Sequence, residues 1–363
     1  IAIESCTCRV GLCEESTYLL IVISQKWRMP FMARIFKTHP IETWLLVLII
    51  VASVILSAFS EQYLTLVNAF DLVNSISINV IFAVGLLVVL ISGGIDISFA
   101  VAASVVQYLA FYALSYLGGG NWLIGFIVAG GLGIMLGAIN AGLIHYFRVI
   151  SIVVTIATFN VFFGLLMFLT KGVSLYDLPD WWTNRIIVFE REMASGSWAE
   201  LTLPAVVMFG AISATWFLIT YTSIGRQIYA FGDNPEGARR IGINVVAVQF
   251  IAYGWMGMMA GIGGLMQAHF MQEIVPNALI GRELDVLAAV VLGGAALGGG
   301  RGTVLGCVLG VLLMAIIQNG LNLLGVTPFA FKAIVGVILL LAITLSNVSF
   351  NELRVGLRME STQ

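Results

Sequence analysis

Long runs of apolar residues, separated by short polar segments, follow one another along most of this chain. A helix that crosses a hydrocarbon core about 30 Å thick needs roughly 20 residues. Runs near this length predict spanning helices at 42–60, 74–92, 99–117, 122–147, 150–169, 203–221, 246–270 and 329–346. Two further runs, 286–299 and 302–324, are interrupted by glycine and bring the predicted total to ten segments. Because 286–299 is short for a span, a half-helix or a re-entrant segment is the alternative there.

Composition supports one membrane domain rather than a soluble protein. Of the 363 residues, 60% are hydrophobic and 10% are charged, whereas about 25% charged is typical of soluble domains. The mean hydropathy is +1.02. We therefore predict an all-α, polytopic helical bundle with a transmembrane domain at 41–347, a cytoplasmic amino-terminal segment at 1–40 and a cytoplasmic tail at 348–363. Residues 1–28 differ in texture from the rest, and we interpret them as non-native, with a natural start at Met29 or Met32.

The distribution of charge predicts the orientation of the bundle and excludes one class of partner. With a formal net charge of −2, the chain has no large basic face with which to bind nucleic acid. Cytoplasmic loops of membrane proteins carry an excess of Lys and Arg. Placing both termini inside puts most of the bases inside, among them Arg34, Lys37, Arg148 and Arg301, and leaves the 171–202 loop outside with an acidic excess.

Three tryptophans in this outer loop, Trp181, Trp182 and Trp198, predict an aromatic belt at the lipid headgroups. A platform on which a ligand stacks is one alternative. An amphipathic segment that lies on the outer surface or meets a partner is the other.

A broken helix is predicted where Gly93 and Gly94 precede Asp96 and Ser98. A charged side chain within a span costs at least about 2.5 kcal/mol, so Asp96 needs a partner or a function. Asp and Ser are favourable helix caps, and either residue can cap the segment that begins near Phe99. A direct role of these four residues in the path or gate of a solute is the alternative.

Neutral amides occur within or beside several apolar runs, and they suit either of two roles. They can line a path for an uncharged, hydroxylated solute, or they can form hydrogen bonds between helices. Ion-coupled carriers usually hold several ionisable groups in their spans, and here only Asp96 and Lys332 are evident, which disfavours that class. The candidate path residues of this kind are Asn79, Asn140, Asn160, Gln318, Asn319 and Asn322.

Motifs for catalysis and for cofactors are not found in the sequence. The four cysteines have no paired spacing, and His145 and His269 are isolated, so we predict no metal and no cofactor in this chain. No Gly-x4-Gly-Lys-Ser/Thr phosphate loop occurs, and no nucleophile stands with a base. These features favour transport driven by another protein over an enzyme.

The polar segment 223–244 predicts a short exposed helix with both ends marked. It supplies an N-cap, a proline at the first helical position, an acid in the first turn, two bases in the last turn and a glycine C-cap. These residues are Asn234, Pro235, Glu236, Arg239, Arg240 and Gly242. Such a short helix is not stable by its own propensity, so the bundle or a partner must hold it.

This segment resembles the cytoplasmic coupling loop of bacterial ABC-importer permeases of the ribose/xylose/arabinose/galactoside class. Their pattern runs approximately Gly-Gly-Asn-x-x-Ala-Ala-x-x-x-Gly-Ile. The resemblance covers about 63–347, through Ala83-Val84-Gly85, Gly93-Gly94-Ile95-Asp96, Gly281-Arg282-Glu283-Leu284-Asp285, the 288–294 run, Gly299-Gly300-Arg301-Gly302 and the 319–326 run. The chain departs from the family at Phe99-Ala100, where Val-Gly is usual, and at Asp233 and Gly237, where Gly and Ala are usual.

The resemblance implies a permease of the inner membrane that dimerises, most simply as a homodimer. It also implies a periplasmic binding protein that delivers a pentose, a hexose or a similar neutral polyol, and a cytoplasmic ATPase that holds ATP and Mg. The residues that would couple to the ATPase are Arg226 and the six residues of the capped helix, and the path would lie near 94–98 and 286–302. Branched-chain amino acids, nucleosides, inositol or a furanosyl signalling molecule remain alternative solutes. An autonomous ion-coupled carrier or channel remains the alternative class.

Overall fold

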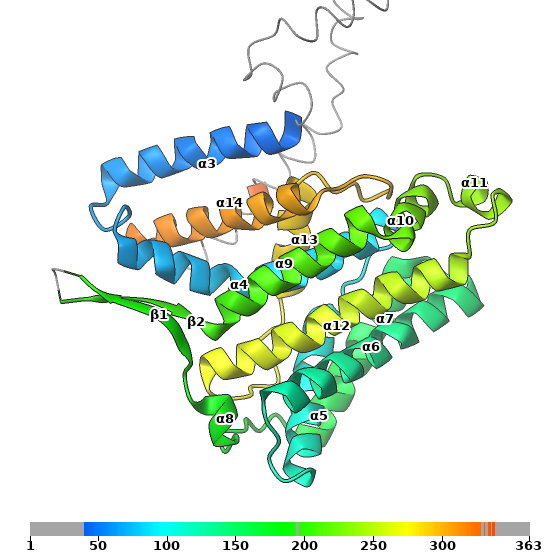
Figure 1. Ribbon diagram of the computed structural model, residues 1–363, viewed down its shortest axis with the longest axis horizontal. Coiled ribbons are helices and arrows are strands. Elements are labelled where there is room, and N and C mark those ends of the chain that lie inside the picture. Colours follow the sequence, from blue (N-terminus) through cyan, green and yellow to red (C-terminus); the bar gives the residue numbers. More distant parts are fainter. Residues whose placement is uncertain (1–39, 194–195, 328–329, 331–332, 335, 338–363) are drawn as a thin grey trace, which may run out of the picture.

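The computed structural model describes residues 40–327 except 194–195, together with residues 330, 333–334 and 336–337. Its helices and strands follow in the order α3 (Pro40–Phe59), α4 (Leu66–Ile91), α5 (Phe99–Tyr116), α6 (Trp122–Phe147), α7 (Ser151–Thr170), α8 (Asp180–Thr183), β1 (Ile187–Glu192), β2 (Trp198–Thr202), α9 (Leu203–Tyr221), α10 (Ser223–Asp233), α11 (Pro235–Arg240), α12 (Val245–Met271), α13 (Arg282–Leu292) and α14 (Val304–Leu323). Figure 1 shows them as one helical bundle with a single small hairpin.

Eight of the described helices are long and apolar enough to cross a membrane: α3, α4, α5, α6, α7, α9, α12 and α14. The prediction of a polytopic helical protein is confirmed. The predicted segment 286–299 is not one continuous helix: α13 has 11 residues and ends at Leu292, which agrees with the half-helix alternative. The predicted span 329–346 and the segments 1–28 and 348–363 lie wholly or mainly outside the described residues.

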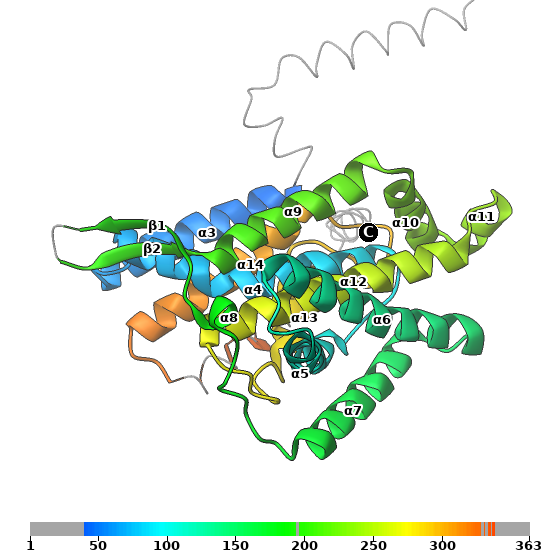
Figure 2. The same ribbon diagram turned by 60° about the horizontal axis from the view of Figure 1, so that its bottom comes forward.

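The longest helix, α12, lies at the centre of the bundle and packs on α4, α5 and α6. Figures 1 and 2 both show α6 running alongside α12. The two backbones meet through glycines: a Cβ on Gly133 would overlap the Gly257 carbonyl, and a Cβ on Gly137 would overlap the Tyr253 carbonyl. Small residues allow this close approach in lipid, where van der Waals packing holds helices together.

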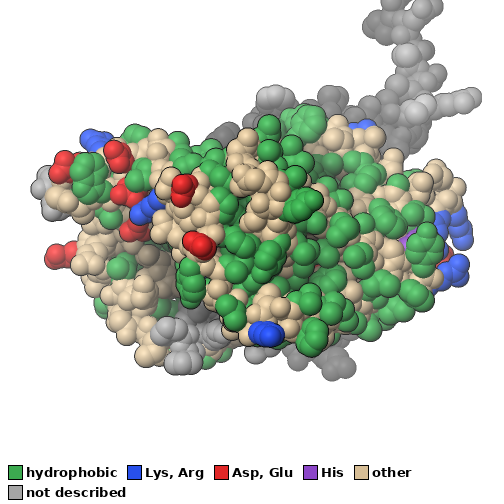
Figure 3. Space-filling model, turned by 90° about the horizontal axis from the view of Figure 1, so that it is seen from below, with side chains coloured by type: hydrophobic (Ala, Val, Ile, Leu, Met, Phe, Trp, Pro, Cys, Tyr) green, Lys and Arg blue, Asp and Glu red, His purple; other side chains and the backbone are tan. Residues whose placement is uncertain are grey.

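The outer surface has the polarity of a protein that crosses a bilayer. In Figure 3, a broad hydrophobic surface separates an acidic end, at the side of the hairpin, from an end with exposed Lys and Arg, at the side of α10 and α11. Large apolar side chains are well exposed on the outer faces of the helices, such as Trp44 on α3 at 64% and Phe168 on α7 at 78%. The charge distribution agrees with the predicted orientation, in which the hairpin lies outside and α10 and α11 lie in the cytoplasm.

Candidate functional site

A polar cavity of about 730 Å³ lies among α4, α12, α13 and α14. Its wall includes Asn68 near the start of α4, Met271 at the end of α12, Arg282 at the start of α13 and Asn322 near the end of α14. With the amino terminus inside, all four of these helix ends lie on the outer side of the membrane. The cavity therefore occupies the outer half of the bundle.

Most polar groups in the cavity wall are neutral amides. Asn319 donates from Nδ2 to Asn68 Oδ1 at 2.9 Å, and Arg282 donates from Nη1 to Asn79 Oδ1 at 3.4 Å. Asn319 Oδ1 and Gln267 Oε1 are buried and have no hydrogen-bond partner among the described residues. A buried acceptor without a partner costs about 1–3 kcal/mol, and a solute in the cavity does not reach these two oxygens in this conformation.

Four of the predicted path residues line this cavity: Asn79, Gln318, Asn319 and Asn322. Three charged residues that the sequence analysis did not assign to a path also line it, namely Asp71, Arg282 and Asp285. The prediction that Asp96 and Lys332 are the evident ionisable groups of the spans is therefore incomplete. It missed Arg282 and Asp285 because α13 begins at Arg282, four residues before the predicted start at 286, and it missed Asp71 because α4 begins at Leu66, eight residues before the predicted start at 74.

A signal for this earlier start was present in the sequence. Cavity-lining polar residues of α4 stand at 68, 71, 75 and 79, and spacings of three and four place them on one face of a helix. Apart from Asn74 and Ser77, the rest of the helix is apolar, so this face indicates contact with water inside a bundle rather than the end of a span.

The other predicted path residues lie elsewhere. Gly93, Gly94, Asp96, Ser98 and Asn140 belong to the cytoplasmic half, where α4 ends and α5 begins. Asn160 lies on the exposed face of α7 and donates from Nδ2 to the carbonyl of Ile156 at 2.8 Å, within its own helix. Its assignment to the path is not supported by this placement, because the amide is already paired and the described cavity wall contains no residue of α7.

Asp96 is held in a buried network at the break between α4 and α5. Its Oδ1 accepts hydrogen bonds from the backbone N–H of Ser98 at 2.8 Å and from Ser98 Oγ at 2.7 Å. Asn140 on α6 donates from Nδ2 to Ser98 Oγ at 2.8 Å. Ser98 occupies the N-cap position of α5, yet its side chain forms no capping hydrogen bond. The capping prediction is therefore wrong for Ser98, whereas Asp96 does accept the backbone N–H of the residue that precedes α5. Together these side chains close the turn and connect it to α6.

The backbone of the same break is connected to α7. The N–H of Ile95 donates to Ser151 Oγ at 3.0 Å, and Thr155 Oγ1 donates to the carbonyl of Ile95 at 3.2 Å. A Cβ on Gly94 would overlap the hydroxyl of Tyr253 on α12. These contacts with α6, α7 and α12 give the break a structural role in joining the inner ends of these helices.

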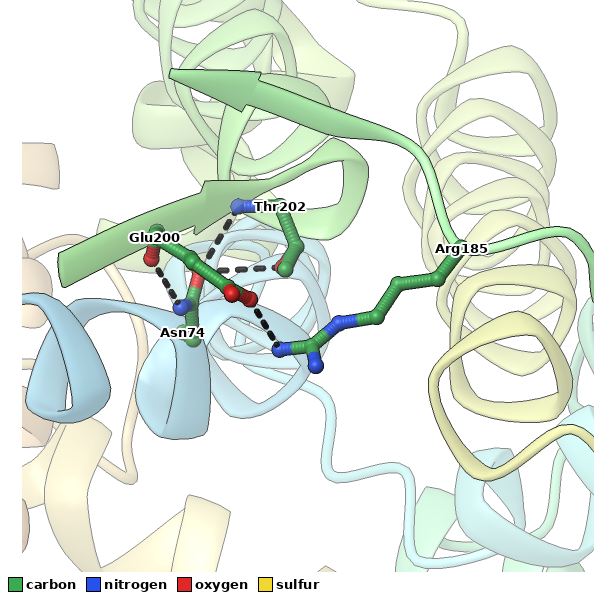
Figure 4. Close-up of polar contacts among 4 residues, drawn as sticks. All are labelled: Asn74, Arg185, Glu200 and Thr202. Carbon is green, nitrogen blue, oxygen red and sulfur yellow. Dashed lines mark hydrogen bonds and ion pairs between the residues drawn. The ribbon is translucent and has the colours of Figure 1, made fainter. Parts of the chain in front are cut away.

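The outer hairpin is attached to the cavity wall through Asn74 (Figure 4). Asn74 Nδ2 donates to the carbonyl of Glu200 at 2.7 Å, and Asn74 Oδ1 accepts from the N–H and the hydroxyl of Thr202 at 3.1 and 2.9 Å. The side chain of Glu200 also pairs with Arg185 at 3.1 Å. Asn74 itself is buried and lines the cavity, so one residue joins the outer hairpin to the cavity wall.

Replacing Asn74 by leucine removes three hydrogen bonds and leaves buried polar groups of Thr202 without partners. Since each lost or unsatisfied hydrogen bond costs about 1 kcal/mol or more, we expect a destabilisation of about 2–4 kcal/mol, measured as a lower unfolding midpoint in detergent. Asn160→Leu is the matched control, because Asn160 bonds only within its own exposed helix. Equal shifts for the two variants would contradict this role of Asn74.

The aromatic belt predicted in this outer loop is wrong for Trp182. Its side chain is fully buried and donates from Nε1 to the carbonyl of Leu265 at 3.1 Å. The backbone carbonyl of Trp182 lies 2.6 Å from Nδ1 of His269. Trp181 stacks on Trp182 and donates from Nε1 to the carbonyl of Gly119 at 2.5 Å. Of the three tryptophans, only Trp198 is well exposed, at 50%. Trp181 and Trp182 instead attach the outer loop to the outer ends of α5 and α12.

At the cytoplasmic side, the capped helix predicted at 234–242 is confirmed as α11. Asn234 Oδ1 accepts from the N–H of Gly237 at 2.9 Å, and Pro235 occupies the start of the helix. Gly242 adopts a positive φ of 85°, and the N–H of Ile243 donates to the carbonyl of Ala238 at 3.0 Å, which closes the helix as predicted.

Most of α11 is exposed to solvent. Ala238 is its buried residue, whereas Glu236, Arg239 and Arg240 are exposed. Figure 2 shows α11 at the edge of the molecule, beyond the cytoplasmic end of α12. Arg226 is also exposed, on the neighbouring helix α10. The helix is therefore placed where a cytoplasmic partner has access to it.

Eight described helices long enough and apolar enough to cross a membrane, a polar cavity among α4, α12, α13 and α14 and an exposed helix with two bases are together typical of the class of polytopic membrane permeases. Within that class, the chain belongs to the family described as branched-chain amino acid transport system / permease component, whose model matches residues 68–343. The predictions of a transport subunit rather than an enzyme, and of a multi-pass inner-membrane protein, are confirmed by this family and by the eight helices.

Three relatives show what this chain is similar to. The ribose import permease protein RbsC of Escherichia coli (strain K12) is 31% identical over 317 residues, which cover 83% of this chain and 92% of that protein. RbsC of Bacillus subtilis (strain 168) is 32% identical over 302 residues, covering 83% and 90%. The autoinducer 2 import system permease protein LsrC of Photorhabdus luminescens is 30% identical over 286 residues, covering 79% and 83%. No solved structure is a significant match to the chain.

Proposed function

We propose that this chain is the permease subunit of an ATP-driven ABC importer, and that a neutral sugar, a pentose or a hexose, passes through the outer cavity. The observation that carries this proposal is the set of neutral amides in the cavity wall. Amide side chains both donate and accept hydrogen bonds, and so do the hydroxyl groups of a sugar. The names of the ribose import permeases support the same class of solute.

The geometry of the cavity suits a solute that passes through rather than one that is held tightly. A volume of about 730 Å³ lies within the range of small-molecule sites, and amide groups on several helices offer successive weak contacts. A path needs binding that is favourable enough for entry and weak enough for exit. Strong selection of the solute would then occur on the binding protein that delivers it.

A zwitterionic amino acid is the second candidate solute. The cavity wall contains Asp71, Arg282 and Asp285, and groups of both signs can pair with an ammonium and a carboxylate. Charge in the cavity wall therefore does not decide between the two solutes, and the proposal of a sugar depends on the amides and on the relatives. The description of the family also names branched-chain amino acids.

Uptake by the complete importer tests the choice between these solutes. The chain is purified from its native membranes with its partners and reconstituted in liposomes with ATP inside. We expect ATP-dependent accumulation of labelled ribose that unlabelled pentoses or hexoses reduce and leucine does not. Accumulation of labelled leucine alone would overturn the sugar proposal. Ion-driven uptake by the chain without partners would overturn the importer proposal.

The proposed partners follow from the two ends of the molecule. An ATPase subunit, which would hold ATP and Mg, would dock on α11 and on Arg226 in the cytoplasm. A periplasmic binding protein would deliver the solute to the outer end, where the cavity and the hairpin lie. A second copy of the chain would complete a homodimer.

Charge reversal on α11 tests the ATPase contact. Arg239 and Arg240 are exposed in the last turn of this helix, so changing both to glutamate replaces two positive charges with two negative ones without disturbing the core. We expect Arg239→Glu with Arg240→Glu to reduce recovery of the ATPase in mild detergent at least tenfold, as measured by quantitative mass spectrometry.

The matched control is Lys171→Glu with Arg191→Glu, which makes the same charge change at exposed positions of the outer side. This control should insert in the membrane and recover the ATPase as the unmodified chain does. Undiminished recovery with the α11 variant would remove this helix from the contact.

A further inference from the structure

Helix α10 is packed against two parts of the bundle that are far apart in the sequence. These parts are the end of α4 and the residues 293–303 between α13 and α14, here called the glycine loop. The N–H of Gly300 donates to the carbonyl of Ile91 at 2.9 Å. A Cβ on Gly232 of α10 would overlap that same carbonyl and would lie 2.6 Å from the nitrogen of Gly300.

The contact is close on every side. A Cβ on Gly299 would lie 2.6 Å from the carbonyl oxygen of Gly232 and 2.7 Å from the Cα of Gly93. Gly299 has a φ of 88° and Gly93 a φ of 81°. Residues other than glycine rarely adopt a backbone φ in this positive range. Three segments therefore meet backbone to backbone, so a movement of α10 displaces the other two directly.

One side chain of α10 adds a specific bond to this contact. Tyr229 donates from its hydroxyl to the carbonyl of Gly302 at 2.6 Å. Burial raises the pKa of Tyr229, so the phenol remains protonated near neutral pH and keeps its role as donor. Residue 302 is the second to last of the glycine loop, directly before the cap of α14.

Helix α13 connects the glycine loop to the outer cavity. Helix α13 leads into the glycine loop, and its residues Arg282, Val286 and Ala289 line the cavity. This helix rests on α14 through glycines: a Cβ on Gly310 would overlap the carbonyl of Ala289, and a Cβ on Gly306 would overlap the carbonyl of Gly293. The closest approaches between this part of the chain and α14 are therefore made by backbone atoms and glycines.

We propose that α13 and the glycine loop form one movable arm between the cavity and the cytoplasmic side, and that Tyr229 is the positioning residue that attaches this arm to α10. The inference rests on the proposed function, because the movement it transmits is that of an ATPase docked on the neighbouring helix α11. When α10 is displaced, the hydrogen bond pulls the glycine loop, and α13 shifts along α14 and changes the wall of the cavity.

Tyr229→Phe tests this proposal because it removes one hydroxyl and keeps the ring. In the complete importer reconstituted in liposomes, we expect ATP hydrolysis within about twofold of the unmodified complex and a fall of at least tenfold in solute moved per ATP hydrolysed. Tyr221→Phe is the matched control: this tyrosine is exposed at the end of α9, and its hydroxyl has no hydrogen-bond partner among the described residues. It should leave the ratio unchanged.

A second measurement follows the arm itself. Gly298 is an exposed position of the glycine loop with open space around its Cα, so Gly298→Cys accepts a fluorescent probe in a chain whose other cysteines are replaced by alanine. We expect the probe signal to change when ATP is added and this change to be lost when Tyr229→Phe is combined with it. A structural role alone would not remove an ATP-dependent signal.

The outcomes separate this inference from the proposed function. If the unmodified complex shows no ATP-dependent uptake, the proposed function fails. If it does take up solute, and Tyr229→Phe keeps both the transport ratio and the probe signal, the inference is overturned and the importer remains. Loss of the ATPase from the Tyr229→Phe complex would also overturn it, because the hydroxyl would then act in assembly.

Discussion

Gly133→Leu will prevent α6 from packing on α12, and the chain will fail to accumulate as a folded membrane protein. The Cβ of any residue at 133 would overlap the carbonyl of Gly257, so the backbones must separate along their whole contact. Glycines at 137, 257 and 261 make equally close approaches in this interface, and separation removes van der Waals contacts at all of them. We expect a destabilisation of at least about 4 kcal/mol, at the upper end for single substitutions.

A leucine two residues earlier on the same helix provides the control. Gly131 has open space around its Cα and is exposed, so Gly131→Leu adds the same side chain to the outer face of α6. Yield after extraction and the unfolding midpoint in detergent measure both variants. If Gly131→Leu and Gly133→Leu are equally stable, glycine contact is not what holds α6 to α12.

Features that depend on neighbouring residues could be predicted from the sequence. The cap of α11 required a good N-cap at Asn234 and a glycine at 242, and both act within one turn of the helix. The spanning helices followed from runs of apolar residues, whose length is fixed by the thickness of the bilayer. The 39 glycines of the chain are typical of helices that pack closely in lipid, but their number alone does not identify the α6–α12 pair.

Features that depend on distant partners were predicted poorly. Trp182 has an interfacial residue type, but the carbonyl of Leu265 lies close enough to pair with its indole, and a distant segment of the chain brings that carbonyl there. Ser98 was expected to be able to cap α5, but its hydroxyl instead donates to Asp96 and accepts from Asn140 of α6. Burial in the core and pairing between helices thus override local preference.

The candidate site shows both kinds of feature. Amides at 79, 318, 319 and 322 were recognised because polar groups are costly in an apolar span. Asp71 and Arg282 were missed because they lie near the ends of helices, where charge needs no special explanation. Only the convergence of α4, α13 and α14 around one cavity gives these end residues and the mid-span amides a common role.

Ala315→Trp will block solute uptake while the complex remains assembled. Ala315 lies on α14 and lines the outer cavity, so an indole there occupies space that a solute needs and covers amides of the opposite wall. Because the cavity holds about 730 Å³, the added ring fits without displacing the core. We expect uptake to fall at least a hundredfold, which corresponds to about 2.7 kcal/mol, with yield and recovery of the ATPase within about twofold of the unmodified chain.

Ala214→Trp is the matched control, since Ala214 lies on α9 at an exposed position of the described surface. The same ring there would face away from the cavity and leave uptake within about twofold. Hydrolysis of ATP measured in parallel distinguishes a blocked path from a lost ATPase, because a blocked path leaves the ATPase bound and active. If Ala315→Trp transports at the normal rate while it is fully inserted and assembled, the solute takes another route through the bundle, and the outer cavity is not its path.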